Sequence, residues 1–132
     1  MLRTESKLNE GIEYLATEVV DAAYSVHKTL GPGLLESVYE KCMCHELSKR
    51  DVCTRTQVSL PVIYDGISID AGLRIDMYVD EQVIIELKSV EKVLPVHKAQ
   101  LLTYMKLANA KLGFLINFNV PLLKNGISRM VL

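Results

Sequence analysis

The segment from Arg74 to Lys88 constrains the fold most, because apolar residues alternate along both sides of a short polar turn. Alternation with a period of two is typical of β-strands that bury one face. A three-residue turn, formed by Asp80, Glu81 and Gln82, would place six apolar residues on one face of a β-hairpin. In that register Val79 pairs with Val83, Met77 with Ile85 and Ile75 with Leu87, while Asp76 faces Glu86 and Arg74 faces Lys88 on the other face.

A two-residue turn would shift this register, place Asp76 opposite Ile85 and send the two acids to opposite faces. The apolar alternation favours the three-residue turn. Directly opposed side chains have Cβ atoms about 4.5–5.5 Å apart, so Asp76 and Glu86 could share one divalent cation. Because buried carboxylates are costly unless they are paired or bind a metal, the hairpin predicts a metal site formed by Asp76 and Glu86, with Lys88 close by. An ion pair on a solvated strand face is the alternative.

The rest of the chain has a periodicity that predicts the element order ααβββαβ, with a short further strand at the end. Gly31-Pro32-Gly33 separates the first two helices, Asp65-Gly66 is a typical hairpin turn, and Pro95 starts the third helix. The expected helices span residues 8–30, 34–50 and 96–108, and the expected strands span residues 57–64, 67–79, 83–89, 112–118 and 127–132.

Two irregularities are expected within the strands. Pro61 indicates an edge position or a bulge in the first strand, and Ala71-Gly72 indicates a bend or bulge in the second. On the second helix, the residues expected to face inward are Leu35, Val38, Tyr39, Cys42 and Leu47.

The composition is that of one folded domain, expected to span residues 1–132, with 49% hydrophobic and 23% charged residues. No apolar run is long enough to cross a bilayer, and residues 1–7 lack the apolar stretch of a signal peptide, so we expect a cytoplasmic protein without a membrane partner. The net charge is −1, but residues 84–132 carry 7 basic and 2 acidic residues, against 8 and 14 in residues 1–83. The basic part could guide a phosphate backbone or form a solvated helix face; its lysines include Lys88, Lys92, Lys98, Lys106 and Lys111.

The three cysteines do not indicate a disulfide framework. Cys42, Cys44, His45 and Cys53 could be taken for a zinc site. However, residues two apart on a helix point about 200° away from each other, so free thiols are favoured. The sequence contains no glycine-rich nucleotide-binding loop and no nucleophile elbow.

Two motifs carry a resemblance to a known family. Residues 33–39 match the pattern Gly-x-x-Glu-x-x-Tyr, and Asp76 with Glu86-Leu87-Lys88 matches Asp…Glu-x-Lys. On these motifs the chain resembles the GxxExxY proteins, which are placed in the PD-(D/E)XK nuclease superfamily, from about Leu8 to Leu123. The resemblance implies a restriction-endonuclease-like α/β fold: an αβββαβ core with a mixed β-sheet flanked by helices and an extra N-terminal helix. One departure is Ile75, which stands where such motifs often have Pro.

The resemblance also implies roles for residues outside the hairpin. Glu36 matches the acid that joins the metal cluster from the preceding helix; the alternative is a carboxylate that favours a helix N-terminus. Gln100, with Tyr104 four residues later, resembles a motif on the helix after Glu-x-Lys; the alternative is a polar flank of an amphipathic helix. His97 shares this face and is expected at the surface or in a cap.

Two further residues near the first motif have structural explanations. Tyr39 follows Glu36 by three residues, so it could pack or hydrogen-bond that acid. His27 lies beside the apolar stripe of the first helix and is expected in the core or as a cap.

Together these features predict a Mg²⁺- or Mn²⁺-dependent nuclease that hydrolyses phosphodiester bonds in DNA. The alternatives are a nuclease-fold binding or interaction module that does not cut, and a hydrolase of a small phosphorylated metabolite. A homo-oligomer or protein partner is hinted at by the apolar segment Val120-Pro121-Leu122-Leu123. The expected catalytic residues are Asp76, Glu86, Lys88 and Gln100, the expected metal ligands are Asp76, Glu86 and Glu36, and the expected substrate-binding residues are Lys92, Lys98 and Tyr104.

Overall fold

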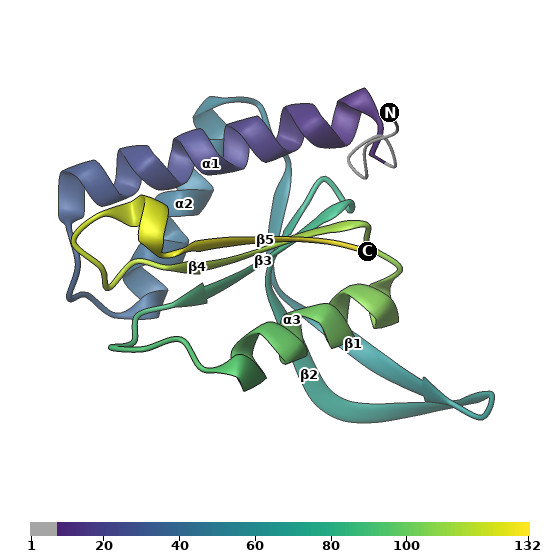
Figure 1. The fold of residues 1–132 in the computed structure, drawn as a ribbon. Helices are drawn as coiled ribbons and strands as arrows, with labels where there is room; N and C mark the ends of the chain where they lie inside the picture. The colour runs from purple at the N-terminus through teal and green to yellow at the C-terminus, as the bar shows by residue number, and fades with distance from the viewer. Residues whose placement is uncertain (1–7) are drawn as a thin grey trace, which may run out of the picture.

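The computed structural model describes residues 8–132, which form a five-stranded mixed sheet with helices on both faces (Figure 1). The predicted order of elements, including the final strand, is confirmed. Residues 1–7, to which the signal-peptide argument applied, lie outside the described residues. The elements are α1 (Glu10–Leu30), α2 (Glu36–Lys49), β1 (Thr54–Tyr64), β2 (Ile67–Val79), β3 (Val83–Lys88), α3 (Pro95–Ala108), β4 (Leu112–Asn117), the short 3₁₀-helix η2 (Leu123–Asn125) and β5 (Ile127–Val131).

The strands follow one another across the sheet in the order β1-β2-β3-β4-β5. Among the strands of the described residues, β3 and β4 form the one parallel pair, and α3 makes the crossover between them. Helices α1 and α2 cover one face of the sheet and α3 covers the other (Figure 1). Both faces of β3 and β4 are therefore buried, which explains why these strands are apolar along almost their whole length.

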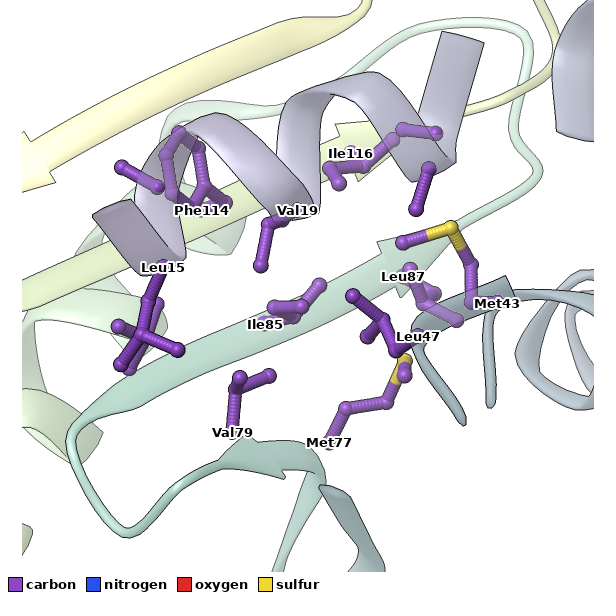
Figure 2. Packing of buried hydrophobic residues seen from close by; sticks show 14 of the residues in the cluster. Leu15, Val19, Met43, Leu47, Met77, Val79, Ile85, Leu87, Phe114 and Ile116 are labelled. Atoms are coloured by element: carbon purple, nitrogen blue, oxygen red, sulfur yellow. The ribbon is translucent and has the colours of Figure 1, made fainter. Parts of the chain in front are cut away.

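The larger part of the core lies between the sheet and helices α1 and α2. Figure 2 shows this packing, with side chains from both helices meeting those of β2, β3 and β4. A second cluster lies under α3 on the opposite face and contains Leu60, Ile75, Ile84, Leu101, Tyr104, Met105, Ala110 and Leu115.

Helix α1 buries one apolar stripe and has well-formed ends; the buried residues are Ile12, Leu15, Ala16, Val19, Ala22, Ala23 and Val26. The Asn9 side chain caps its start by accepting a hydrogen bond from the Ile12 N–H at 2.8 Å. Gly31, with φ of 70°, follows its end in a conformation that few other residues adopt without strain. Among the described residues, no helix is both long enough and apolar enough to cross a membrane.

The expected inward face of α2 is wrong at its first turn. Leu35 is 73% exposed and Val38 is 38% exposed, whereas Met43 is fully buried. The helix begins at Glu36, so Leu35 is its N-cap residue and does not belong to the helical stripe. The buried stripe is formed by Tyr39, Met43 and Leu47, which are four residues apart.

The irregularities expected in β1 and β2 are confirmed. The register of the β1–β2 ladder shifts between Leu60 and Val62, on either side of Pro61, and β1 is an edge strand. Leu60 pairs with Leu73 and Val62 pairs with Ile69, so β2 contains the extra residues. Gly72 is one of them and has φ of 70°. The turn at Asp65-Gly66 has positive φ at both residues, as the sharp turn of a hairpin requires.

The three-residue turn between β2 and β3 is also confirmed, because Val79 pairs with Val83 and Met77 pairs with Ile85. The expectation that Ile75 shares their face is wrong. Ile75 packs in the cluster under α3, whereas Met77 and Val79 pack against α1 and α2. The alternation of side chains between the two faces of the sheet is therefore interrupted in β2 at Asp76.

Candidate functional site

The two acids of the hairpin meet where the sheet forks. The β2–β3 ladder ends at the pair Met77–Ile85, and beyond it β2 continues with β1 while β3 continues with β4. In place of the next ladder bonds, the Asp76 N–H donates to Glu86 Oε2 at 3.1 Å, and the Leu87 N–H donates to Asp76 Oδ2 at 2.9 Å. Each carboxylate thus satisfies a backbone donor that the fork leaves without a carbonyl partner.

Glu86 is the acid with the most unusual environment. It is only 6% exposed and lies between Ile85 and Leu87 on a buried strand. Burial, together with the negative charge of Asp76, raises the pKa of Glu86 to about 8, although the Asp76 N–H and the Lys88 ammonium act in the opposite direction. At neutral pH this position therefore favours either a proton or a bound cation.

Asp76 lines a polar pocket of about 460 Å³. The pocket lies between α2 and the strands β1, β2 and β3 at the fork, and its lining residues are Glu36, Ser37, Glu40, Gln57, Asp76 and Leu87. Glu36 is the first residue of α2, and its negative charge contributes to the raised pKa of Glu86. The structure therefore places Glu36 and Asp76 in the lining of the same pocket.

Tyr39 holds the loop that leads into Glu36. Its hydroxyl donates to the Gly31 carbonyl at 2.6 Å and accepts from the Leu34 N–H at 3.2 Å, so it does not bond Glu36 itself. The ring is fully buried and stacks on Phe118, with centroids 4.4 Å apart. The Ser89 hydroxyl also donates to the Leu34 carbonyl, which connects this loop to the end of β3.

His27 has the structural role that the sequence analysis favoured. Its Nε2 lies 2.7 Å from the Val120 carbonyl oxygen, and its ring stacks near Phe118. Val120 belongs to the segment proposed as a partner surface, in which Leu122 is 58% exposed but Leu123 is buried.

Lys88 ends β3 and pairs with Asn117 of β4 in the parallel register. Asn117 is buried and was not singled out from the sequence. Its side chain accepts from the Val90 N–H at 3.1 Å and donates to the Val90 carbonyl at 3.0 Å, so it fixes the chain just after Lys88. The signal for it was one amide residue in the otherwise apolar stretch 112–118.

The expected residues around α3 are not among the residues that line this pocket. Gln100 is exposed and donates from Nε2 to the Tyr104 hydroxyl at 2.9 Å, while the Tyr104 ring is buried under the helix. His97 Nδ1 accepts from the Leu94 N–H at 3.0 Å, which confirms its role as a cap. Lys92 and Lys98 are exposed.

The arrangement of the acids determines which metal ion they could hold. Among residues 8–132, no three His, Cys, Asp or Glu side chains lie close enough to share one ion, so the expected three-acid cluster is not assembled. Cys42, Cys44 and Cys53 are free thiols. Asp76 and Glu86 nevertheless offer only oxygen donors, and Mg²⁺ commonly uses one or two carboxylates while it keeps several waters. A cation would stabilise the ionised form of Glu86, which burial and Asp76 disfavour and whose pKa they raise to about 8. The pair Asp76 and Glu86 therefore fits such an ion.

A mixed sheet that forks at an Asp…Glu-x-Lys motif defines the class of this protein. The family model of the PD-(D/E)XK nuclease superfamily matches residues 13–130. The chain therefore belongs to the PD-(D/E)XK nuclease superfamily. No curated protein and no solved structure matched the chain in the corresponding comparisons.

Proposed function

We propose that this protein is a Mg²⁺- or Mn²⁺-dependent nuclease that hydrolyses phosphodiester bonds in DNA. The observation that carries the proposal is the pair Asp76 and Glu86, fixed at the fork of the sheet with Lys88 two residues further on. Membership of a nuclease superfamily supports the same reaction class.

In this proposal the two carboxylates are metal ligands that the backbone has already oriented. The sequence places one on each strand of the hairpin, and the two N–H donors engage Oδ2 of Asp76 and Oε2 of Glu86. The second oxygen of each group is then available for a cation. A divalent cation at this place would neutralise charge on the phosphate and lower the pKa of an attacking water. Glu36 would complete the ligand set from α2 by a change of rotamer.

Lys88 supplies a positive charge beside the acids, as its effect on the pKa of Glu86 requires. As an ammonium it would stabilise the charge on the pentavalent transition state, and as an amine it would take the proton of the attacking water. Gln100 would be an accessory that orients water or a phosphate. The buried Tyr104 would act through its hydrogen bond to Gln100.

We also propose that the chain is a GxxExxY protein. The loop between α1 and α2 gives the motif a physical explanation: Gly33 has φ of 99°, Glu36 lines the pocket, and Tyr39 bonds both ends of the loop. Each of the three named positions of the motif thus helps to place one acid next to the fork.

The proposal is tested by incubating the protein with linear, circular and single-stranded DNA in Mn²⁺ and in EDTA. Lys88→Ala is the active-site variant, and Lys28→Ala, at an exposed position on α1, is the matched control. We expect cleavage only with Mn²⁺, lost in Lys88→Ala and kept in Lys28→Ala. The circular substrate separates cutting within a strand from cutting at an end.

One observation favours the second candidate, a nuclease-fold binding module. Among the described residues, the three acids do not gather into a metal cluster. Such a module would bind DNA at low salt but cut none of the substrates, although both variants remain folded. In that case Mn²⁺ would not raise the melting temperature, whereas a formed metal site stabilises the protein by about 2.7 kcal/mol at one hundred times the dissociation constant.

A further inference from the structure

Gln57 has a backbone conformation that does not belong in a strand. Its φ is 52°, although it lies in the middle of β1, where φ is normally near −120° to −140°. The other non-glycine residues with positive φ in the described part of the chain lie in turns or at a helix end: Asp51, Asp65, Asp80, Glu81 and Asn109. Such a conformation costs a non-glycine residue roughly 1–2 kcal/mol, so the surrounding structure must hold it in place.

The residue that lies across the sheet from Gln57 is Asp76. Thr56 pairs with Met77 and Val58 pairs with Ile75, but the pair between them, Gln57 with Asp76, is missing from the ladder. The register is the same on both sides of the gap, so no residue is inserted as it would be in an ordinary bulge.

The gap coincides with the change of face in β2. Ile75 packs under α3, whereas Met77, two residues later, packs against α1 and α2. In a regular strand, residues two apart point to the same face. The β1–β2 ribbon therefore turns over at Gln57 and Asp76, and it is at this point that it leaves β3 (Figure 1).

This change of face in the β1–β2 ribbon directs the Asp76 side chain toward β3. Its carboxylate accepts the Leu87 N–H, a bond that a side chain pointing straight out of the sheet would not make. The Gln57 side chain also donates from Nε2 to Glu40 Oε2 at 2.9 Å, so the same residue joins β1 to the α2 wall of the pocket.

We propose that Gln57 is a positioning residue, whose left-handed backbone turns β1 and β2 at Asp76 and so aims the Asp76 carboxylate into the fork beside Glu86. The inference deepens the proposed function, because the orientation of Asp76 matters most if Asp76 holds a metal ion. It assigns this role to the backbone of Gln57, while the side chain contributes the bond to Glu40.

The test uses substitutions that separate backbone from side chain. Gln57→Gly and Gln57→Asn tolerate the left-handed conformation, whereas Gln57→Val resists it. Glu40→Ala removes the side-chain bond alone. Asp65→Val strains a left-handed residue at the distant β1–β2 turn and is the matched control. The primary readout is amide hydrogen exchange of Leu87 in EDTA without DNA, followed by the Mn²⁺-dependent shift in melting temperature.

We expect Gln57→Val to increase the exchange rate of the Leu87 amide by roughly tenfold and to reduce the Mn²⁺ shift. Gln57→Gly, Gln57→Asn and Asp65→Val should retain both values of the unaltered protein, and Glu40→Ala should retain the Leu87 exchange rate. Unchanged Leu87 exchange in Gln57→Val would overturn the inference, as would equal losses in Gln57→Gly and Gln57→Val. If Gln57→Val does not fold, Gln57→Ala takes its place.

The exchange readout needs neither metal nor substrate. Loss of Leu87 protection in Gln57→Val, in a protein that neither binds Mn²⁺ nor cuts DNA, would support the positioning role while the proposed function failed. Intact protection in the same variant, in a protein that cuts DNA, would overturn the positioning role alone.

Discussion

At the scale of single residues, the chemistry of the site depends on where each carboxylate finds its hydrogen-bond donors. Asp76 and Glu86 both accept backbone N–H groups across the fork, but Glu86 is the more deeply buried. Burial disfavours the ionised form, and the neighbouring charge of Asp76 adds to this effect. The result is a carboxyl group that stays protonated at neutral pH unless a cation replaces the proton.

This environment predicts a pH dependence of stability in EDTA. The pKa of Glu86 rises from its ordinary value of 4.5 to about 8 in the folded chain, so its contribution to stability is complete below about pH 4.5 and is lost as the pH rises through 8. The free energy of unfolding should fall by at most about 1.4 kcal/mol per pH unit between pH 4.5 and 8. Glu86→Gln should remove the decline, as measured by urea unfolding at a series of pH values.

The exposed Glu91→Gln variant is the control for that series. Its stability should decline with pH in parallel with the unaltered protein. A Glu86→Gln profile that also ran in parallel would show that Glu86 is not the group responsible. Mn²⁺ should reduce the decline in the unaltered protein.

At the scale of elements, two connecting segments determine where the functional side chains lie. The loop between α1 and α2 is held by Tyr39 and Ser89, and it delivers Glu36 to the pocket. The segment after β3 is held by Asn117, which bonds Val90 through both atoms of its amide group. In each case a side chain from a packed element satisfies backbone groups of a segment that has no ladder of its own.

Tyr39→Phe tests the first of these connections. The variant keeps the stacked ring but loses the hydroxyl, which leaves the Leu34 N–H and the Gly31 carbonyl without this partner. We expect a loss of about 1–2 kcal/mol in the free energy of unfolding and a smaller Mn²⁺ shift. Tyr24→Phe, at an exposed position on α1, should change neither value.

Asn117→Ala tests the second connection. Removing the amide leaves the backbone N–H and carbonyl of Val90 without their partner. We expect urea unfolding to show a loss of about 1–3 kcal/mol, and DNA cleavage to fall further than stability alone explains, because Lys88 loses its fixed position. The exposed Asn125→Ala variant should behave like the unaltered protein. Equal stabilities of the two variants would contradict this role of Asn117.

At the scale of the whole molecule, the fold places an acidic pocket in a chain whose basic residues are concentrated in its second half. Residues 84–132 carry a net charge of +5 and residues 1–83 carry −6, by subtraction of their acidic from their basic residues. The exposed Lys92 and Lys98 follow β3 and begin α3, respectively, so they belong to the half that contains Lys88. A polyanion would be attracted to the surface around these two exposed lysines.

The double variant Lys92→Ala/Lys98→Ala tests whether these lysines contact phosphates. Each lost phosphate contact should reduce the slope of log affinity against log salt by about 1, so the slope should become shallower by about 2. The measurement is DNA binding at a series of salt concentrations in Ca²⁺ or EDTA. Lys28→Ala/Lys124→Ala, at two other exposed lysines, should retain the slope.

Much of the fold could be predicted because the local patterns agree with the tertiary structure. The alternation around Asp80–Gln82 determined the register of the central hairpin, and the glycine and proline positions determined the turns. The errors occurred where packing overrides a pattern. Leu35 fits a helical stripe but lies just outside the helix, and Ile75 fits a strand's alternation but lies beyond the change of face at Asp76.

The sequence by itself determined the element order, the pairing of Met77 with Ile85 and the pair of acids within an apolar hairpin, since these depend on residues close together in the chain. Only the tertiary structure decided that the sheet forks at Asp76, that Glu86 has a raised pKa and that Asn117 supports the segment after Lys88. These properties depend on contacts between segments far apart in the chain. Burial and hydrogen-bond partners of that kind are set by packing, which periodicity does not specify.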